Sequence, residues 1–141
     1  MAMNELNDHL DERVTIYLAI ESTDLKPSAL TDRLGACPDR EWVIGAPRGK
    51  TGKRWECHGW VVETTVRSEE VGGQSASKLI PVAMERFERR VGPFAKAISE
   101  LDSAQKYVVL TILAEHIPGI ECSHSFLDLV STIGGTFQID L

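Results

Sequence analysis

An alternating run near the N-terminus constrains the fold of this chain more than any other feature. Between Arg13 and Glu21 every second residue is aliphatic: Val14, Ile16, Leu18 and Ile20. This two-residue period predicts a β-strand with one apolar face. A short amphipathic helix should follow, because Pro27 suits the first turn of a helix and Gly35 suits the left-handed residue that ends one. We expect the helix to cover the apolar face of the strand.

The last third of the chain repeats this layout. A strand is expected over residues 107–116, then a loop containing Pro118, a serine-led helix that stops at Gly134, and a strand over residues 136–140. Apolar residues occupy both odd and even positions of the 107–116 segment, which predicts a strand at the centre of the sheet. The likeness to the first unit lies in layout more than in identical residues. A duplicated half is therefore one interpretation, and a two-layer fold is the expectation.

Two further strands and two further helices are expected between these units. Residues 41–44 and 55–66 should pair as a long hairpin around an exposed loop rich in glycine and cations. Helices are expected over residues 78–91, capped by Ser77, and over residues 94–101. The order β-α-β-β-α-α-β-α-β predicts an α+β protein. We expect a single two-layer sandwich, related to ferredoxin-like folds, with a mixed sheet of four to five strands and helices mainly on one face.

The length of 141 residues allows a single hydrophobic core. Residues 13–141 are expected to form one domain, preceded by a flexible polar tail over residues 1–12. That tail lacks the basic start and apolar segment of a signal peptide, and no apolar run approaches the roughly 20 residues of a membrane helix. The three cysteines cannot all pair within the chain. We therefore expect free thiols and a cytoplasmic location.

The net charge of −6 is unevenly distributed. The first 24 residues hold six acids and one arginine, and no Lys or Arg follows Lys106, whereas residues 40–54 hold five cations. Such a field repels nucleic acid and favours a basic protein partner. The candidate partner-binding residues are acids from the two ends of the chain: Glu21, Asp24, Glu115, Glu121 and Asp128.

One loop comes close to a phosphate-binding motif. Residues 45–51, GAPRGKT, contain the Gly-Lys-Thr ending of such a loop, but the spacer before it is one residue short. A strand is expected to follow, so the loop lacks the helix N-terminus that holds phosphate. A solvated hairpin tip is the better interpretation.

A second set of residues has the chemistry of zinc ligands. Cys57, His58, Cys122 and His124 could hold the metal if their segments met. Adjacent residues of a strand point to opposite faces, so only one of Cys57 and His58 could join such a site. A buried thiol and a surface imidazole are the alternative, and we assign no metal and no other cofactor.

Two acids stand where the first strand gives way to the first helix. Glu21 and Asp24 could perform acid–base chemistry if they were buried together. Acids in such a turn more often cap the helix, and Asp24 suits that role near Pro27. No nucleophile elbow occurs in the sequence. No catalytic residue is therefore assigned, and an enzyme that uses Glu21, Asp24 or His58 is an alternative based on residue types alone.

Several short motifs together resemble a bacterial family. They are the acidic turn before Leu25-Lys26-Pro27, the Leu30-x-x-x-Leu34-Gly35 helix, Pro38, Gly45, the Trp60-x-x-x-Thr64 strand and the Ile139-Asp140 ending. With these motifs, residues 14–141 are similar to the family known as domain of unknown function 4279. The resemblance implies no catalytic residues. It implies an immunity role, because such small proteins can sit near secreted toxins.

These observations lead us to expect a non-enzymatic binding protein. The expected partner is a basic toxin domain, which the chain would neutralise through an acidic surface. Neither nucleic acid nor a membrane is expected as a partner, and a homodimer is compatible with the sequence. The alternatives are a small-molecule sensor, since strand-to-helix crossovers often bind metabolites, and a dimerising α+β module.

Overall fold

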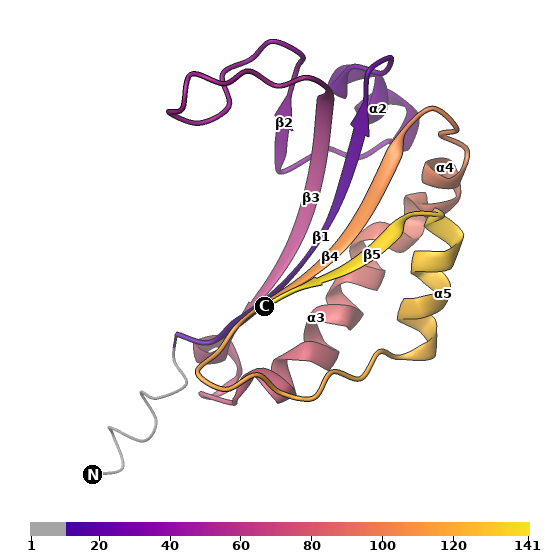
Figure 1. Ribbon diagram of the computed structural model, residues 1–141. Coiled ribbons are helices and arrows are strands. Elements are labelled where there is room, and N and C mark those ends of the chain that lie inside the picture. Colours follow the sequence, from indigo (N-terminus) through magenta and orange to yellow (C-terminus); the bar gives the residue numbers. More distant parts are fainter. Residues whose placement is uncertain (1–10) are drawn as a thin grey trace.

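The computed structural model describes residues 11–141 and contains a sheet of five strands with helices packed against it (Figure 1). The strands are β1 (Arg13–Ser22), β2 (Arg40–Trp42), β3 (His58–Arg67), β4 (Gln105–Leu113) and β5 (Thr136–Asp140). The α-helices are α2 (Pro27–Leu34), α3 (Ala76–Val91), α4 (Ala95–Ser99) and α5 (His124–Ile133), and two short 3₁₀ turns flank α3, η1 (Ser68–Val71) and η2 (Gly92–Phe94).

The strands follow the spatial order β2-β3-β1-β4-β5, and only β4 and β5 are parallel neighbours. Both β3 and β4 run antiparallel to β1, so the helical connection from β3 to β4 spans the strand between them. The connection from β1 to β2 spans β3 in the same way. Two interleaved split β-α-β units of this kind define the ferredoxin-like arrangement, to which this chain adds α5 and β5. The predicted mixed α+β sandwich is confirmed.

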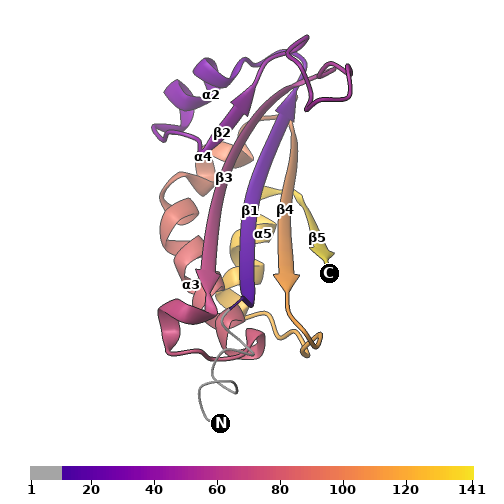
Figure 2. The same ribbon diagram turned by 90° about the vertical axis from the view of Figure 1, so that its left-hand side faces the viewer.

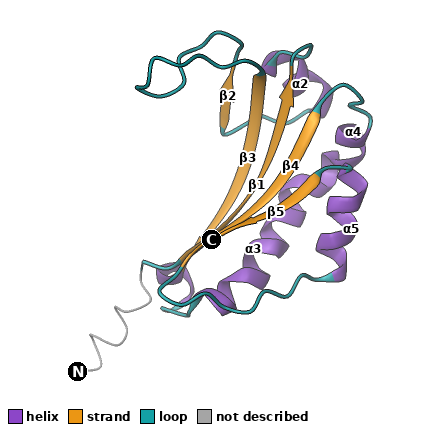
Figure 3. Ribbon diagram, in the orientation of Figure 1, coloured by secondary structure: helices purple, strands orange, loops and turns teal. Residues whose placement is uncertain are grey.

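All the α-helices lie on one face of the sheet, as Figures 2 and 3 show. The apolar positions of β1 point toward them and are fully buried, in the register that the alternation predicts. Trp60 on β3 and Phe87 on α3 are among the largest fully buried side chains. The aromatic ring of Phe126, which α5 supplies, lies edge-on to those of Phe87 and Phe137, so the core is continuous from α3 to the last strand.

Several predicted strand limits are wrong. The predicted antiparallel pairing of these two segments is confirmed, but β2 ends at Trp42 and β3 begins at His58, so both strands stop short of the predicted limits at the loop end. Backbone hydrogen bonds between Gly45 and Trp55 and between Arg48 and Lys53 continue the pairing within the 43–57 loop. β4 begins at Gln105 and ends at Leu113, and it lies beside the central strand, which is β1. The alternation of residues 55–57 suggested a strand, but these residues precede β3, and their side chains pack on Trp42 of β2 and Glu21 of β1.

The helix starts also differ from the predictions. α3 begins at Ala76 after Ser75, two residues before the predicted start at residue 78. α2 follows Lys26 and has no side-chain cap, so the predicted cap by Asp24 is wrong. The hydroxyl of Ser22 makes the turn instead, because its Oγ accepts hydrogen bonds from the backbone N–H groups of Asp24 and Leu25, at 3.1 and 3.0 Å. The helix ends at Gly35 and Gly134 are confirmed, with φ of 66° and 77°.

Glu12 ties the start of the folded chain to two distant segments. Its side chain is buried, with Oε2 accepting a hydrogen bond from Ala76 N at 3.0 Å and Oε1 accepting one from Glu115 N at 3.3 Å. The carboxylate thus serves as the N-terminal cap of α3, where it also opposes the positive end of the helix dipole. The prediction of a flexible tail over residues 1–12 is therefore wrong for Glu12. Residues 1–10 lie outside the described part of the chain.

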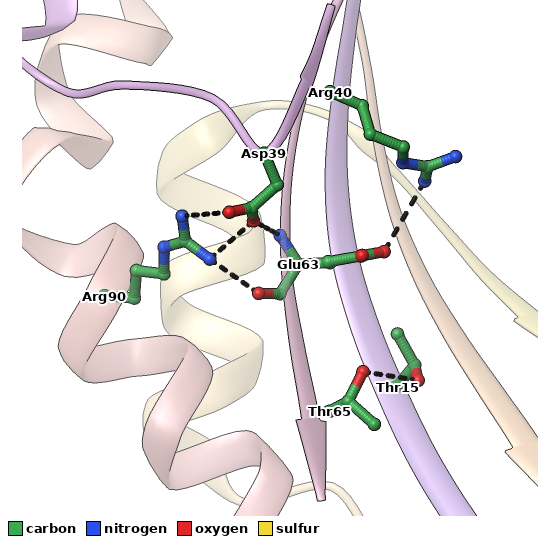
Figure 4. A network of polar contacts seen from close by, with 6 residues as sticks. All are labelled: Thr15, Asp39, Arg40, Glu63, Thr65 and Arg90. Carbon is green, nitrogen blue, oxygen red and sulfur yellow. Dashed lines mark hydrogen bonds and ion pairs between the residues drawn. The ribbon is translucent and has the colours of Figure 1, made fainter.

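A side-chain clip, formed by Asp39 and Arg90, closes the edge of β3 just beyond the first residue of β2 (Figure 4). β2 pairs with β3 only as far as Val61, so the next outward-facing backbone groups, those of Glu63, have no strand partner. Glu63 N donates to Asp39 Oδ2 at 2.8 Å, and Glu63 O accepts from Arg90 Nη1 at 2.6 Å. Arg90 also binds both carboxylate oxygens of Asp39, and this bidentate contact holds the pKa of Asp39 below its usual value.

Candidate functional site

The face of the sheet opposite the helices is open and hollowed. Its lining residues come from all five strands and from the 43–57 loop, and they surround a volume of about 480 Å³. They are Tyr17, Ala19, Glu21, Arg40, Trp42, Arg48, Trp55, Val61, Tyr107, Val109, Thr111, Gln138 and Asp140. The register explains this set, because it places the side chains that point away from the helices side by side on neighbouring strands. We call this concavity the open-face hollow.

Stacked aromatic rings form one end of the open-face hollow. The indoles of Trp42 and Trp55 lie face to face with centroids 4.1 Å apart, and the guanidinium of Arg48 lies 4.5 Å above the Trp55 ring. Beneath the stack, Trp42 rests on Gly59, where a β-carbon would lie only 2.0 Å from Trp42 Cε2. Glycine is thus required for the indole to approach the sheet this closely. The stack anchors the 43–57 loop to the sheet.

Backbone and imidazole contacts hold the same loop in place. Trp55 exchanges hydrogen bonds with Gly45 and Ala46 across the loop, and Arg54 Nη1 donates to Gly45 O at 2.7 Å. His58, buried at the start of β3, accepts a hydrogen bond on Nδ1 from Ile44 N at 3.1 Å. The imidazole therefore acts as a structural acceptor. This contact explains why His58 is buried, and no catalytic role is needed to explain it.

The charged side chains of the open-face hollow have different partners within the chain. Arg40 lies 3.5 Å from the carboxylate of Glu63 (Figure 4), and Arg48 stacks on the indole described above. Glu21 and Asp140 take part in no ion pair within residues 11–141. The hollow is consequently suited to a ligand that brings aliphatic or aromatic surface together with a positive charge.

Glu21 contacts the thiol of Cys57. The Sγ atom donates to Glu21 Oε2 at 3.5 Å, and burial together with the nearby carboxylate raises the pKa of the thiol. The indole N–H of Trp42 is buried beside this pair without a hydrogen-bond partner in the described part of the chain. Its position near the sulfur favours the thiolate and so acts against the rise in the pKa of Cys57. A thiol in such surroundings stays protonated and is a poor nucleophile.

The predicted partner-binding acids do not form one cluster. Glu21 lines the open-face hollow, and Asp24 is exposed in the turn just after β1. Glu115 follows the far end of β4, Glu121 lies in the loop before α5, and Asp128 lies on the exposed side of α5. Only Glu21 is therefore part of the hollow.

The candidate metal and phosphate ligands are not gathered either. Cys57 and His58 lie at the start of β3, beside the end of β1, whereas Cys122 and His124 lie at the start of α5, near the opposite end of the strands. No group of three or more His, Cys, Asp or Glu residues that could hold a metal occurs between residues 11 and 141. Residues 45–51 are an exposed loop, and the segment after them leads to β3 and not to a helix.

The sequence reasoning missed most of the residues that line the open-face hollow. Tyr17, Tyr107 and Gln138 stand at the positions between the core residues of their strands, where they face away from the helices. A signal was present, because the polar positions of β1 include an aromatic residue and an alanine that solvent exposure alone does not favour. Knowing which strands are neighbours was needed to see that these side chains meet.

No helix within residues 11–141 combines the length and apolar character needed to cross a bilayer. Neither a curated protein nor a solved structure matches this chain. The family model described as "Domain of unknown function (DUF4279)" matches residues 12–141, which is nearly the whole chain and starts at the buried Glu12. The chain belongs to this family of unknown function.

Proposed function

We propose that this protein is a non-enzymatic binding protein whose partner docks in the open-face hollow. One observation carries the proposal: a sheet with helices on one face keeps its other face open and lines it with aromatic, aliphatic and charged side chains. An open face that served only as solvated surface would need none of the tyrosine and tryptophan side chains found there. Aromatic groups with a polar end are typical of binding surfaces.

The charge of the hollow favours a basic partner. Arg40 lies beside Glu63 and Arg48 stacks on Trp55, while Glu21 and Asp140 form no ion pair within residues 11–141 and lie at different places along the hollow. The net charge of −6 adds a long-range attraction that speeds the encounter with a cationic protein and weakens with salt. We therefore place a basic protein domain in the hollow.

In biological terms we propose an immunity role in the bacterial cytoplasm, with a toxin domain as the basic partner. An immunity protein can block the active site of a toxin by covering it, and this requires no catalytic residue. The aromatic, aliphatic and charged lining of the hollow suits such a binding role. The free state of Cys37, Cys57 and Cys122 suits a reducing compartment.

Co-expression with a basic toxin domain encoded beside the gene tests this function. Thr111 is half-buried in the floor of the hollow, so Thr111→Arg adds bulk and a positive charge where the partner would dock. We expect wild type to restore growth and Thr111→Arg to lose most of that protection. Ser103→Arg, an exposed change in the turn before β4, is the matched control and should protect like wild type. Equal protection by both variants would contradict the proposed docking site.

A small-molecule sensor is the second candidate, and the size of the hollow favours it. A volume of about 480 Å³ falls within the roughly 300–1,000 Å³ of small-ligand pockets. Thermal shift against a panel of cationic and aromatic metabolites distinguishes the two functions. A ligand that raises the midpoint of wild type but not of Thr111→Arg, without any protein partner, would replace the first proposal by this one.

A further inference from the structure

The two edges of the sheet are built differently. At the β2 edge, the side chains of Asp39 and Arg90 occupy the backbone groups of β3 that β2 leaves unpaired. At the opposite edge, β5 is regular and contains no Lys, Arg or Pro, and four of its five residues are exposed. Exposed edges without such protective residues are sites of strand pairing between molecules.

The surroundings of the β5 edge are largely apolar, with Asp140 at the end of β5 and Lys106, which donates to Ile133 O, near its start. Ile139 on β5 is 46% exposed, and Leu127 on the adjacent α5 is 44% exposed. Asp128 is the one Asp, Glu, Lys or Arg residue of α5, whereas the exposed side of α3 carries Lys78, Glu85, Arg86 and Arg89. Depletion of charge around exposed aliphatic groups is characteristic of the centre of a protein interface.

The sequence of β5 is complementary to itself in the antiparallel sense. If two copies pair with Gln138 on the two-fold axis, Thr136 lies opposite Asp140 of the partner subunit, and Phe137 lies opposite Ile139 of the partner subunit. Phe137 and Ile139 both point to the helix side of the sheet, as their pairing with Val108 and Leu110 shows. Cross-strand pairs of an aromatic and a β-branched residue, as this one would be, stabilise antiparallel sheets.

We propose that a second copy of this chain pairs with the outer edge of β5 in antiparallel orientation. The result is a ten-stranded sheet in which the helices of both copies lie on one side and the two α5 helices meet across the axis. A two-fold axis of this kind makes the interface isologous and closed, so assembly stops at the dimer. The open-face hollows of the two copies, each lined by Gln138 and Asp140 near this edge, become one continuous surface.

Light scattering coupled to size exclusion tests the pairing and its location. The full chain should elute with the mass of two chains, and Ile139→Lys and Leu127→Glu should each reduce this to one. Val43→Lys introduces the same charge at a residue of matched exposure, 46%, next to the opposite edge, and should leave the dimer intact. A single-chain mass for wild type at about 100 µM would exclude a dissociation constant in the micromolar range and overturn the proposal. A dimer unaffected by both edge variants would overturn it as well.

A disulfide at the axis tests the register. In a Cys37→Ser background, which removes the exposed native thiol, Gln138→Cys places two thiols opposite each other across the axis. This variant should form a covalent dimer on mild oxidation, whereas Thr136→Cys, which would face Asp140 of the partner subunit, should not. Equal cross-linking of both variants would contradict the antiparallel register centred on Gln138.

Discussion

The indole of Trp42 lies flat against Gly59, on the neighbouring strand and in the position where any other residue would carry its β-carbon. This contact places Trp42 under Trp55 and thereby fixes the 43–57 loop at the end of the open-face hollow. The shape of the hollow therefore depends on one glycine in a buried strand.

Replacing this glycine should disturb the loop first. Gly59→Ala puts a β-carbon 2.0 Å from Trp42 Cε2, so the indole must move and the stack with Trp55 must open. We expect a cost of about 1–3 kcal/mol in the free energy of unfolding, typical of overpacking. The exciton signal of the stacked indoles in circular dichroism should be lost. Gly92→Ala, where nothing lies within 4 Å, is the control and should keep that signal. An unchanged signal in Gly59→Ala would show that Trp42 does not rest on Gly59.

The clip at the β3 edge should make stability depend on acid pH. Because Arg90 lowers the pKa of folded Asp39, the extra stability is present above the unfolded pKa of about 3.9 and is lost as the pH falls through the lower, folded value. Asp39→Asn should cost about 0.5–1.5 kcal/mol at neutral pH, a modest figure because both side chains are partly exposed. Urea unfolding at several pH values checks this. The difference between wild type and variant should shrink below about pH 4, and a constant difference would contradict the account.

Glu12 should matter far more than its neighbour in sequence. Glu12→Ala leaves the N–H groups of Ala76 and Glu115 without their acceptor, at a cost of about 1–3 kcal/mol. Asp11→Ala, an exposed change one residue away, should stay within about 0.5 kcal/mol of wild type. Denaturant unfolding measures both. Similar effects of the two changes would indicate that Glu12 does not cap α3.

The three thiols should differ in reactivity. Cys37 is exposed, whereas burial raises the pKa of Cys122, and burial together with Glu21 raises that of Cys57. Iodoacetamide at mildly alkaline pH should therefore label Cys37 first, as peptide mapping can follow. Glu21→Gln should speed the labelling of Cys57 and leave that of Cys122 unchanged. If Glu21→Gln does not alter Cys57, the carboxylate does not control this thiol.

Local patterns in the sequence predict the layers of this fold but not its open face. The alternation in β1 and the glycines at 35 and 134 report on nearest neighbours along the chain, so the strand and the helix ends are predictable. Trp55 and Cys57 alternate like strand residues, yet they pack on Trp42 and Glu21, which a local pattern does not contain.

Long-range partners explain the remaining misses. The role of Glu12 depends on residues 64 and 103 positions away, and composition alone assigned it to a tail. The acids chosen from the two ends of the chain shared a sign but not a place, because β1 carries Glu21 to one end of the sheet and β4 carries Glu115 to the other. Charge along the sequence thus does not show where charged residues gather in the fold.

Photo-crosslinking in cells tests the central claim that the open-face hollow receives a protein partner. A benzophenone amino acid would replace Tyr107, an aromatic residue that lines the hollow, or, in a matched control, Ser77 on the exposed side of α3. In cells that also produce the neighbouring toxin domain, the account predicts an adduct of the two proteins from position 107 and none from position 77. An adduct from position 77 alone, or from neither position while the toxin is neutralised, would contradict the account.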